Sequence, residues 1–96
     1  MKEDLIITDH AYKRAKERFR WKRSSLDRTA REAFKNGITH KDTKGSLNRF
    51  ITKLWKEYEN CGNIRIYGEV IYFFKGSLLI TLYQIPNKYK KYVSKL

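Results

Sequence analysis

Apolar residues in the first forty positions recur at helical spacing. In the segment HAYKRAKERFRW, residues 10–21, they lie four apart, at Ala11, Ala15 and Phe19. This spacing predicts one buried stripe on a helix that ends near Phe19. Leu5 to Ile7 form a short apolar entry, either a strand or an extended anchor, and Thr8 or Asp9 is expected to cap the helix because a short side-chain oxygen accepts the first free N–H groups.

Two further helices follow from the same kind of pattern. Ser24-x-x-Asp27 resembles a capping box, Leu26, Ala30, Ala33 and Phe34 mark one face, and Gly37 is expected to stop the second helix. After a polar loop at 39–45, a third helix is predicted from about Ser46. Its apolar positions fall at helical intervals, at Leu47, Phe50, Ile51, Leu54, Trp55 and Tyr58. Leu54 is expected to be buried because it lies in the middle of this stripe.

The last third of the chain changes to runs typical of strands. IRIY, EVIYFF and LLITLYQI, at 64–67, 69–74 and 78–85, are rich in β-branched and aromatic residues and separated by glycine-containing turns. The order predicts a single α+β domain over 1–96, in which N-terminal helices pack on a C-terminal antiparallel sheet of three strands or slightly more. One sheet face is expected to pack on the helices, and an antiparallel sheet allows the other to stay open to water. The core is expected over 5–86, and 87–96 as a basic tail, either a short helix or disordered.

The charge of the chain restricts its partners. Lysine and arginine total 22 against 10 acidic residues, and the net charge of +12 favours a polyanion, above all RNA, with DNA or an acidic protein as alternatives. Cys61 is the only cysteine, so neither an intramolecular disulfide nor a cysteine metal cluster can form, and no cofactor or metal is expected. Without a signal-peptide pattern or an apolar run of membrane-spanning length, the expected location is the cytoplasm.

His10, Arg14 and Arg18 are the candidate catalytic residues, because four-residue spacing places them on one helix face, with Glu17 beside them. An imidazole can act as acid or base near neutral pH, and guanidinium groups can hold a phosphate. The simpler interpretation is a solvated basic face on which His10 makes local capping contacts. Phosphate binding without catalysis is a third interpretation for the two arginines.

Further candidates for binding nucleic acid lie on the first helix, at the corner after it and in the last strand: Lys13, Arg20, Lys22, Arg23 and Tyr83. Tyr83 either stacks on a base or is an ordinary half-buried sheet residue. His40, in the polar loop, is a weaker candidate for a direct role. Trp21 and Trp55 are interpreted as core or corner residues.

The pattern His10-Ala11-x-x-Arg14-x-x-x-Arg18, together with the late strand LLITLY, resembles a family of small bacterial and phage domains. Those domains carry an HAxxRxxxR helix and a late IITVY-like strand. The family is similar in turn to the RelE/ParE-like toxin superfamily, whose members are mostly compact, basic, metal-independent endoribonucleases. The resemblance covers residues 5–37 and 64–85. The corner Phe19-Arg20-Trp21-Lys22 departs from the short glycine-containing turn that relatives tend to have.

The resemblance implies a RelE-like fold and metal-independent cleavage of RNA, in a toxin with an acidic antitoxin partner. The matching positions are His10, Arg14, Arg18 and, more weakly, Thr81. The alternative is a non-catalytic nucleic-acid-binding module, such as a phage-encoded inhibitor of a host nucleoprotein. A histidine clustered with cations in a concavity favours the enzyme, whereas charges along a convex face favour the binding module.

Overall fold

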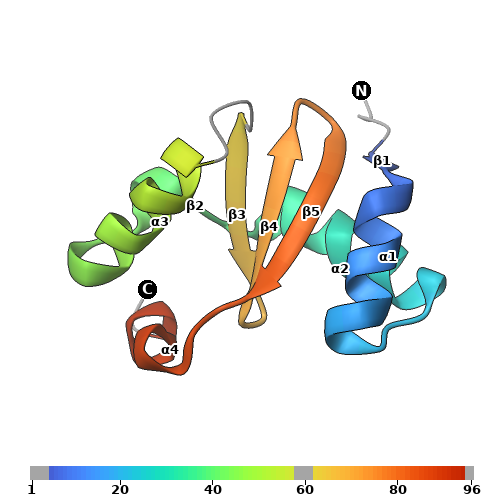
Figure 1. The fold of residues 1–96 in the computed structure, drawn as a ribbon. Coiled ribbons are helices and arrows are strands. Elements are labelled where there is room, and N and C mark those ends of the chain that lie inside the picture. Colours follow the sequence, from blue (N-terminus) through green and yellow to red (C-terminus); the bar gives the residue numbers. More distant parts are fainter. Residues whose placement is uncertain (1–4, 58–61, 95–96) are drawn as a thin grey trace.

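The computed structural model describes residues 5–57 and 62–94 (Figure 1). The elements run in the order β1 (Ile6–Ile7), α1 (Asp9–Phe19), α2 (Arg23–Asn36), β2 (Ile38–Thr39), η1 (His40–Asp42), α3 (Gly45–Glu57), β3 (Asn63–Tyr67), β4 (Val70–Lys75), β5 (Leu78–Gln84) and α4 (Asn87–Ser94). The α+β class is confirmed. The helices are not confined to the N-terminal part, however, since α4 follows the last strand.

The sheet has five strands in the order β1-β5-β4-β3-β2. The predicted meander of β3, β4 and β5 is confirmed, with each strand antiparallel to the next. The two edge strands contain two residues each. β1 pairs in parallel with β5 at Leu78 and Leu79, and β2 pairs with β3 in antiparallel direction. The sheet is therefore mixed, and the expectation of a purely antiparallel sheet was wrong.

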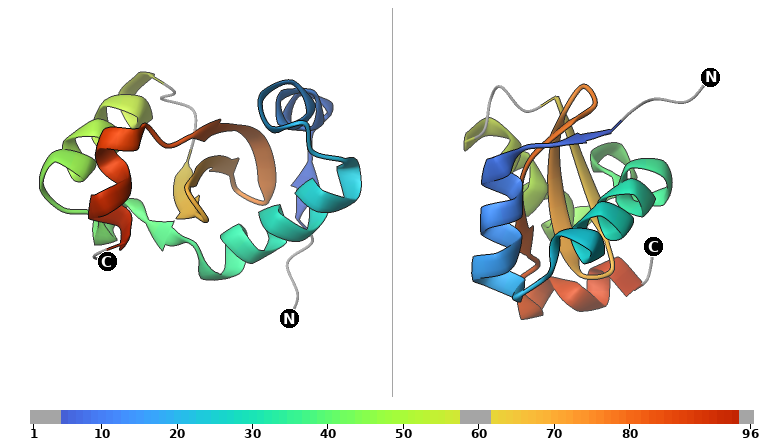
Figure 2. Two further views of the ribbon diagram at one scale, coloured as in Figure 1. Left: turned by 90° about the horizontal axis from the view of Figure 1, so that it is seen from below. Right: turned by 90° about the vertical axis from the view of Figure 1, so that its right-hand side faces the viewer.

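Helices cover both faces of the sheet, so the open face that an antiparallel sheet would allow is absent among the described residues. α1 and α2 pack on one face around Tyr72 and Phe74, whereas α3 and α4 pack on the other around Ile71 and Phe73. Figure 2 shows α1 beside β5, with α3 and α4 at the opposite end of the sheet. Residues 70–74 are all buried, because β4 is the middle strand. The unbroken apolar run VIYFF, typical of a strand buried on both faces, is the signal for this arrangement.

The helix ends agree only partly with the predicted caps. Thr8 caps α1 as expected, since its Oγ1 accepts the N–H of Ala11 at 3.2 Å. α2 begins one residue before Ser24, and Lys22 occupies its N-cap position without a side-chain hydrogen bond. Asp27 instead accepts a hydrogen bond from the Tyr12 hydroxyl at 2.5 Å, and this bond raises the pKa of Tyr12. The predicted capping box does not form because its carboxylate joins α1 to α2.

Gly37 ends α2 as predicted, but for a different reason. Its backbone is extended, with φ −65° and ψ 152°, so left-handed geometry is not what requires glycine here. A Cβ atom at this position would lie 2.4 Å from the Ala33 carbonyl oxygen and 2.9 Å from the Cβ of Arg65. The close passage of the chain from α2 into β2 therefore excludes a side chain.

The polar loop and the basic tail both contain regular structure. The segment 39–45 includes the end of β2 and the short helix η1, and 87–94 forms α4. Tyr89 of α4 stacks on Phe50 of α3 with ring centroids 4.5 Å apart, and Tyr92 and Val93 join the same core. The tail is thus a packed helix. Tyr58 and Cys61 lie outside the described residues.

The first prediction concerns the core on α3. Leu47 is fully buried, whereas Leu54, expected to be buried, is only half-buried. Leu47→Ala should lower the free energy of unfolding by about 2–5 kcal/mol, as for a fully buried leucine, and Leu54→Ala by less because water already reaches its site. Urea unfolding followed by circular dichroism checks both values. Equal losses in the two variants would contradict this placement of α3.

Candidate nucleic-acid interface

Two alanines and a threonine position α1 along β5. Ala11 and Ala15 are fully buried, and their small side chains let the helix backbone approach the strand closely. At the start of the helix, the Thr8 hydroxyl donates to the carbonyl oxygen of Leu79 at 2.9 Å. β1 pairs with β5 only at residues 78 and 79, so α1 lies beside the rest of this strand edge. The side chains that lie next to the alanines around the helix axis, namely His10, Arg14 and Arg18, therefore extend over β5.

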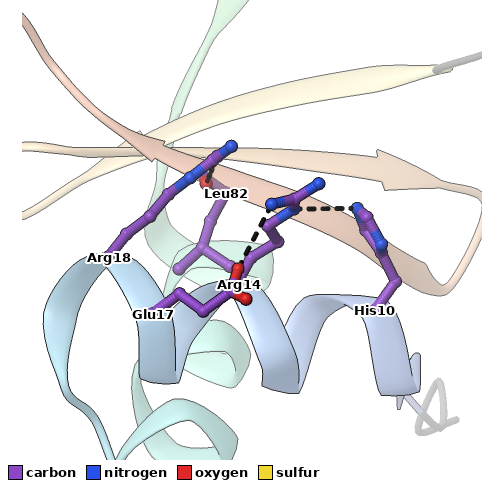
Figure 3. Close-up of polar contacts among 5 residues, drawn as sticks. All are labelled: His10, Arg14, Glu17, Arg18 and Leu82. Atoms are coloured by element: carbon purple, nitrogen blue, oxygen red, sulfur yellow. Dashed lines mark hydrogen bonds and ion pairs between the residues drawn. The ribbon is translucent and has the colours of Figure 1, made fainter.

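His10 and Arg14 contact each other on this face of α1 (Figure 3). The Nε–H of Arg14 donates to Nε2 of His10 at 3.3 Å. Arg14 also pairs with Glu17, with Nη1 3.2 Å from Oε1. The imidazole is solvent-exposed. The result is an accessible histidine beside a guanidinium whose charge is partly balanced by a carboxylate.

Arg18 lies one turn further along and is bound to β5. Its Nη1 donates to the carbonyl oxygen of Leu82 at 2.9 Å, and its Cζ lies 4.0 Å from the ring centroid of Tyr83. Tyr83 also makes an edge-to-face contact with Phe73, at 5.5 Å between centroids. Tyr83 thus supports Arg18 with its ring. This arrangement fits the interpretation of Tyr83 as a sheet residue better than base stacking.

The structure brings His10, Arg14 and Arg18 onto one helix face, as their spacing predicted. Thr81 does not share this exposed helix face, because it lies within strand β5 of the sheet. It pairs with Phe73 across the β4–β5 ladder, next to the register shift at Phe74, and it is 3% exposed. Its hydroxyl has no hydrogen-bond partner within residues 5–57 and 62–94. Burial at this depth keeps Thr81 from direct contact with a bound phosphate.

The other predicted cations gather on a different surface, called the basic hollow below. This open hollow of about 750 Å³ lies at the corner between α1 and α2 and is lined by Asp9, Tyr12, Lys13, Ala15, Lys16, Arg20, Trp21, Lys22 and Arg23. Four of the five residues predicted to bind nucleic acid line it, and Tyr83 does not. Lys16, which the sequence analysis did not single out, joins them because it lies one turn from Lys13 on α1. The candidate residues therefore form two neighbouring surfaces of the same helix.

The corner at the basic hollow is held in one shape by several contacts. Arg20 ends α1 in the left-handed region with φ 56°, and the N–H of Trp21 then donates to the Ala15 carbonyl oxygen at 3.3 Å. The Trp21 ring stacks on Phe19 with centroids 4.8 Å apart. Across the hollow, Arg23 lies 4.0 Å above the ring of Tyr12 and 3.9 Å from the carboxylate of Asp9.

His40 belongs to a separate cluster at the far edge of the sheet. Its Nε2 lies 2.8 Å from the Thr52 hydroxyl, and the Thr43 hydroxyl donates to its carbonyl oxygen at 2.6 Å. The contact with Thr52 joins η1 to α3, and the Thr43 bond closes the end of η1. Within residues 5–57 and 62–94 there is no group of three or more histidine, cysteine or acidic residues that could hold a metal ion. No helix in this part of the chain has the length and apolar character needed to cross a bilayer.

The second prediction separates the two arginines by stability. Arg18→Ala removes both a hydrogen bond to a backbone carbonyl and a cation–π contact, so we expect it to lower the free energy of unfolding by about 1–2 kcal/mol. Arg14→Ala removes an exposed ion pair and should cost no more than about 0.5 kcal/mol. Urea unfolding of both variants under the same conditions makes the comparison. A more damaging Arg14→Ala would show that Arg14, rather than Arg18, fixes α1 to the sheet.

Comparison of the chain with family models, with curated proteins and with solved structures gives no match. The resemblance to RelE/ParE-like domains therefore stays a prediction from the residues that carry it.

Proposed function

We propose that this protein binds RNA through α1 and cleaves it without a metal ion, as a cytoplasmic RelE-like endoribonuclease. The observation that carries the proposal is the contact between Arg14 and Nε2 of His10 at 3.3 Å. An exposed imidazole and a guanidinium this close together can contact the same phosphodiester. Arg18 adds a second guanidinium one turn away, fixed in place by Leu82 and Tyr83.

The proposed reaction is transesterification within the RNA strand. Nε2 of His10 takes the proton of a ribose 2′-hydroxyl as the 2′-oxygen attacks the adjacent phosphorus. The bond from phosphorus to the 5′-oxygen breaks, and water at this exposed face protonates that oxygen. Arg14 exchanges its hydrogen bond to His10 for one to a phosphate oxygen, and Arg18 stabilises the charge that develops on the phosphorane. The products carry a 2′,3′-cyclic phosphate and a 5′-hydroxyl.

A second candidate function, nucleic-acid binding without catalysis, is favoured by the distribution of the cations. Five of them line the basic hollow, and His10 does not lie among them. Arg14 already pairs with Glu17, and Arg18 with Leu82 and Tyr83. Such a module would hold the RNA backbone or block a host nucleoprotein. The same basic surface would also attract an acidic partner protein, as an antitoxin would be.

The third prediction tests cleavage. Purified protein in EDTA should cut a long single-stranded RNA and leave 2′,3′-cyclic phosphate ends. His10→Ala should slow the cut by about 10²–10⁴-fold while binding survives, since loss of general base help has this typical size. Arg18→Ala should weaken binding and cleavage together, because a phosphate contact acts in both the ground state and the transition state.

His10→Gln is the matched control, because its amide oxygen still accepts the hydrogen bond from Arg14 but cannot serve as the base. It should be as slow as His10→Ala. Equal cleavage by wild type and both variants would show that another residue or a contaminant is responsible. A wild-type protein that binds RNA and never cuts it would leave the binding module as the function.

The fourth prediction tests which cations meet the phosphates. RNA affinity should fall steeply with salt, and each lost phosphate contact should reduce the slope of log K against log salt concentration by about 0.7 for a single strand. Lys13→Ala and Lys22→Ala should each do this. Lys75→Ala, at the exposed end of β4, is the matched control and should leave the slope unchanged. Equal slopes in all four proteins would remove the basic hollow from the interface.

A further inference from the structure

We propose that the basic hollow binds one unpaired nucleotide, with the base stacked on Trp21 and the flanking phosphates held by the surrounding cations. The inference rests on the proposed binding of RNA and adds the class of substrate, namely single-stranded rather than duplex nucleic acid. It does not depend on cleavage, because His10 is not part of the basic hollow.

Four of the five cations of the basic hollow are available to a ligand. Lys13, Lys16, Arg20, Lys22 and Arg23 are all exposed, and Asp9 supplies the one carboxylate among the lining residues. Arg23 is occupied by its stacking on Tyr12 and by Asp9. The remaining four carry the positive potential of the basic hollow. They come from both α1 and the corner after it, so two segments of the chain contribute positive charge to the basic hollow.

Trp21 gives the basic hollow a feature that phosphate binding alone does not need. The indole is half-buried, Phe19 supports it at 4.8 Å, and the left-handed Arg20 fixes where it lies. One ring face is thus occupied by Phe19, and we assign the part of the ring that borders the basic hollow to a base. An aromatic ring surrounded by cations is the usual arrangement for holding single strands, since every base has a face to stack and a phosphate beside it.

Duplex nucleic acid fits this arrangement poorly. Its bases are stacked on each other and their faces are out of reach, so only the phosphates could contact the basic hollow. A basic surface without Trp21 would not distinguish the two forms. The indole among the residues that line the basic hollow is therefore the observation that favours a single strand.

The test uses tryptophan fluorescence in a protein with one tryptophan. Trp55 lies on α3 at the opposite end of the sheet and is 41% exposed, so Trp55→Phe leaves Trp21 as the only emitter with little effect on the fold. The probe is a 2′-O-methyl RNA of about ten nucleotides, within the range of typical single-strand site sizes. It lacks the attacking hydroxyl, so it is bound and never cut.

We expect saturable quenching of Trp21 emission by the single strand and much weaker quenching by a duplex of the same sequence. In the converse protein, Trp21→Leu with Trp55 retained, emission should stay unchanged, and affinity for the single strand should fall about fivefold to a hundredfold, the usual loss for one stacked base. Duplex affinity should change far less. Asp9→Asn should tighten binding of both forms, because it removes the one negative charge of the basic hollow.

Circular dichroism and urea unfolding show whether Trp21→Leu is folded, and the measurement on Trp55→Phe does not depend on that variant. Binding of the probe, measured by fluorescence anisotropy of a label on it, without any change in Trp21 emission would overturn the inference and leave the proposed RNA binding intact. Equal quenching by single strand and duplex would overturn it as well. Absence of binding by the wild type would overturn the inference and the proposed function together.

Discussion

The close contact between α1 and β5 is the constraint on which both candidate surfaces depend. Ala11 and Ala15 face β5 and the adjoining core, and their small size lets the helix lie directly beside the strand. With successive residues about 100° apart around the axis, this contact decides where every other side chain of α1 points. A larger residue at Ala15 would push the helix away and separate Arg18 from the Leu82 carbonyl.

The same contact explains why one short helix can present two kinds of basic surface. His10, Arg14 and Arg18 lie on the side that extends over β5, and one of them is tied to that strand. Lys13, Lys16 and Arg20 lie on a different side of the helix. There they line the basic hollow, beside the corner where the chain turns into α2. The first surface is shaped by sheet contacts and the second by the corner. A strand of RNA that follows α1 would meet both, because the two faces adjoin.

Local patterns predicted the fold where the information is local. Helix α1 ends at Phe19, and the three long strands pair in sequence order, because apolar spacing and glycine turns are properties of short segments. The two-residue strands β1 and β2 were harder to predict from the sequence. β1 exists because residues 6 and 7 meet Leu78 and Leu79, more than seventy positions away. α4 was ambiguous for a similar reason, since only packing of Tyr89 on Phe50 distinguishes a docked helix from a basic tail.

For the candidate site, spacing showed which residues share a face but not what each of them contacts. The four-residue interval placed His10, Arg14 and Arg18 together, and nothing in the sequence indicated that Arg18 binds the Leu82 carbonyl or stacks on Tyr83. Those contacts give Arg18 a structural role, because they connect α1 to β5. The partners of Arg14, in contrast, are exposed side chains of its own helix. A guanidinium held by the sheet keeps its place when a phosphate arrives, and one held by His10 and Glu17 can change partners. In the proposed reaction the two arginines would therefore have different tasks: Arg18 would position the phosphodiester, and Arg14 would leave the imidazole free to react.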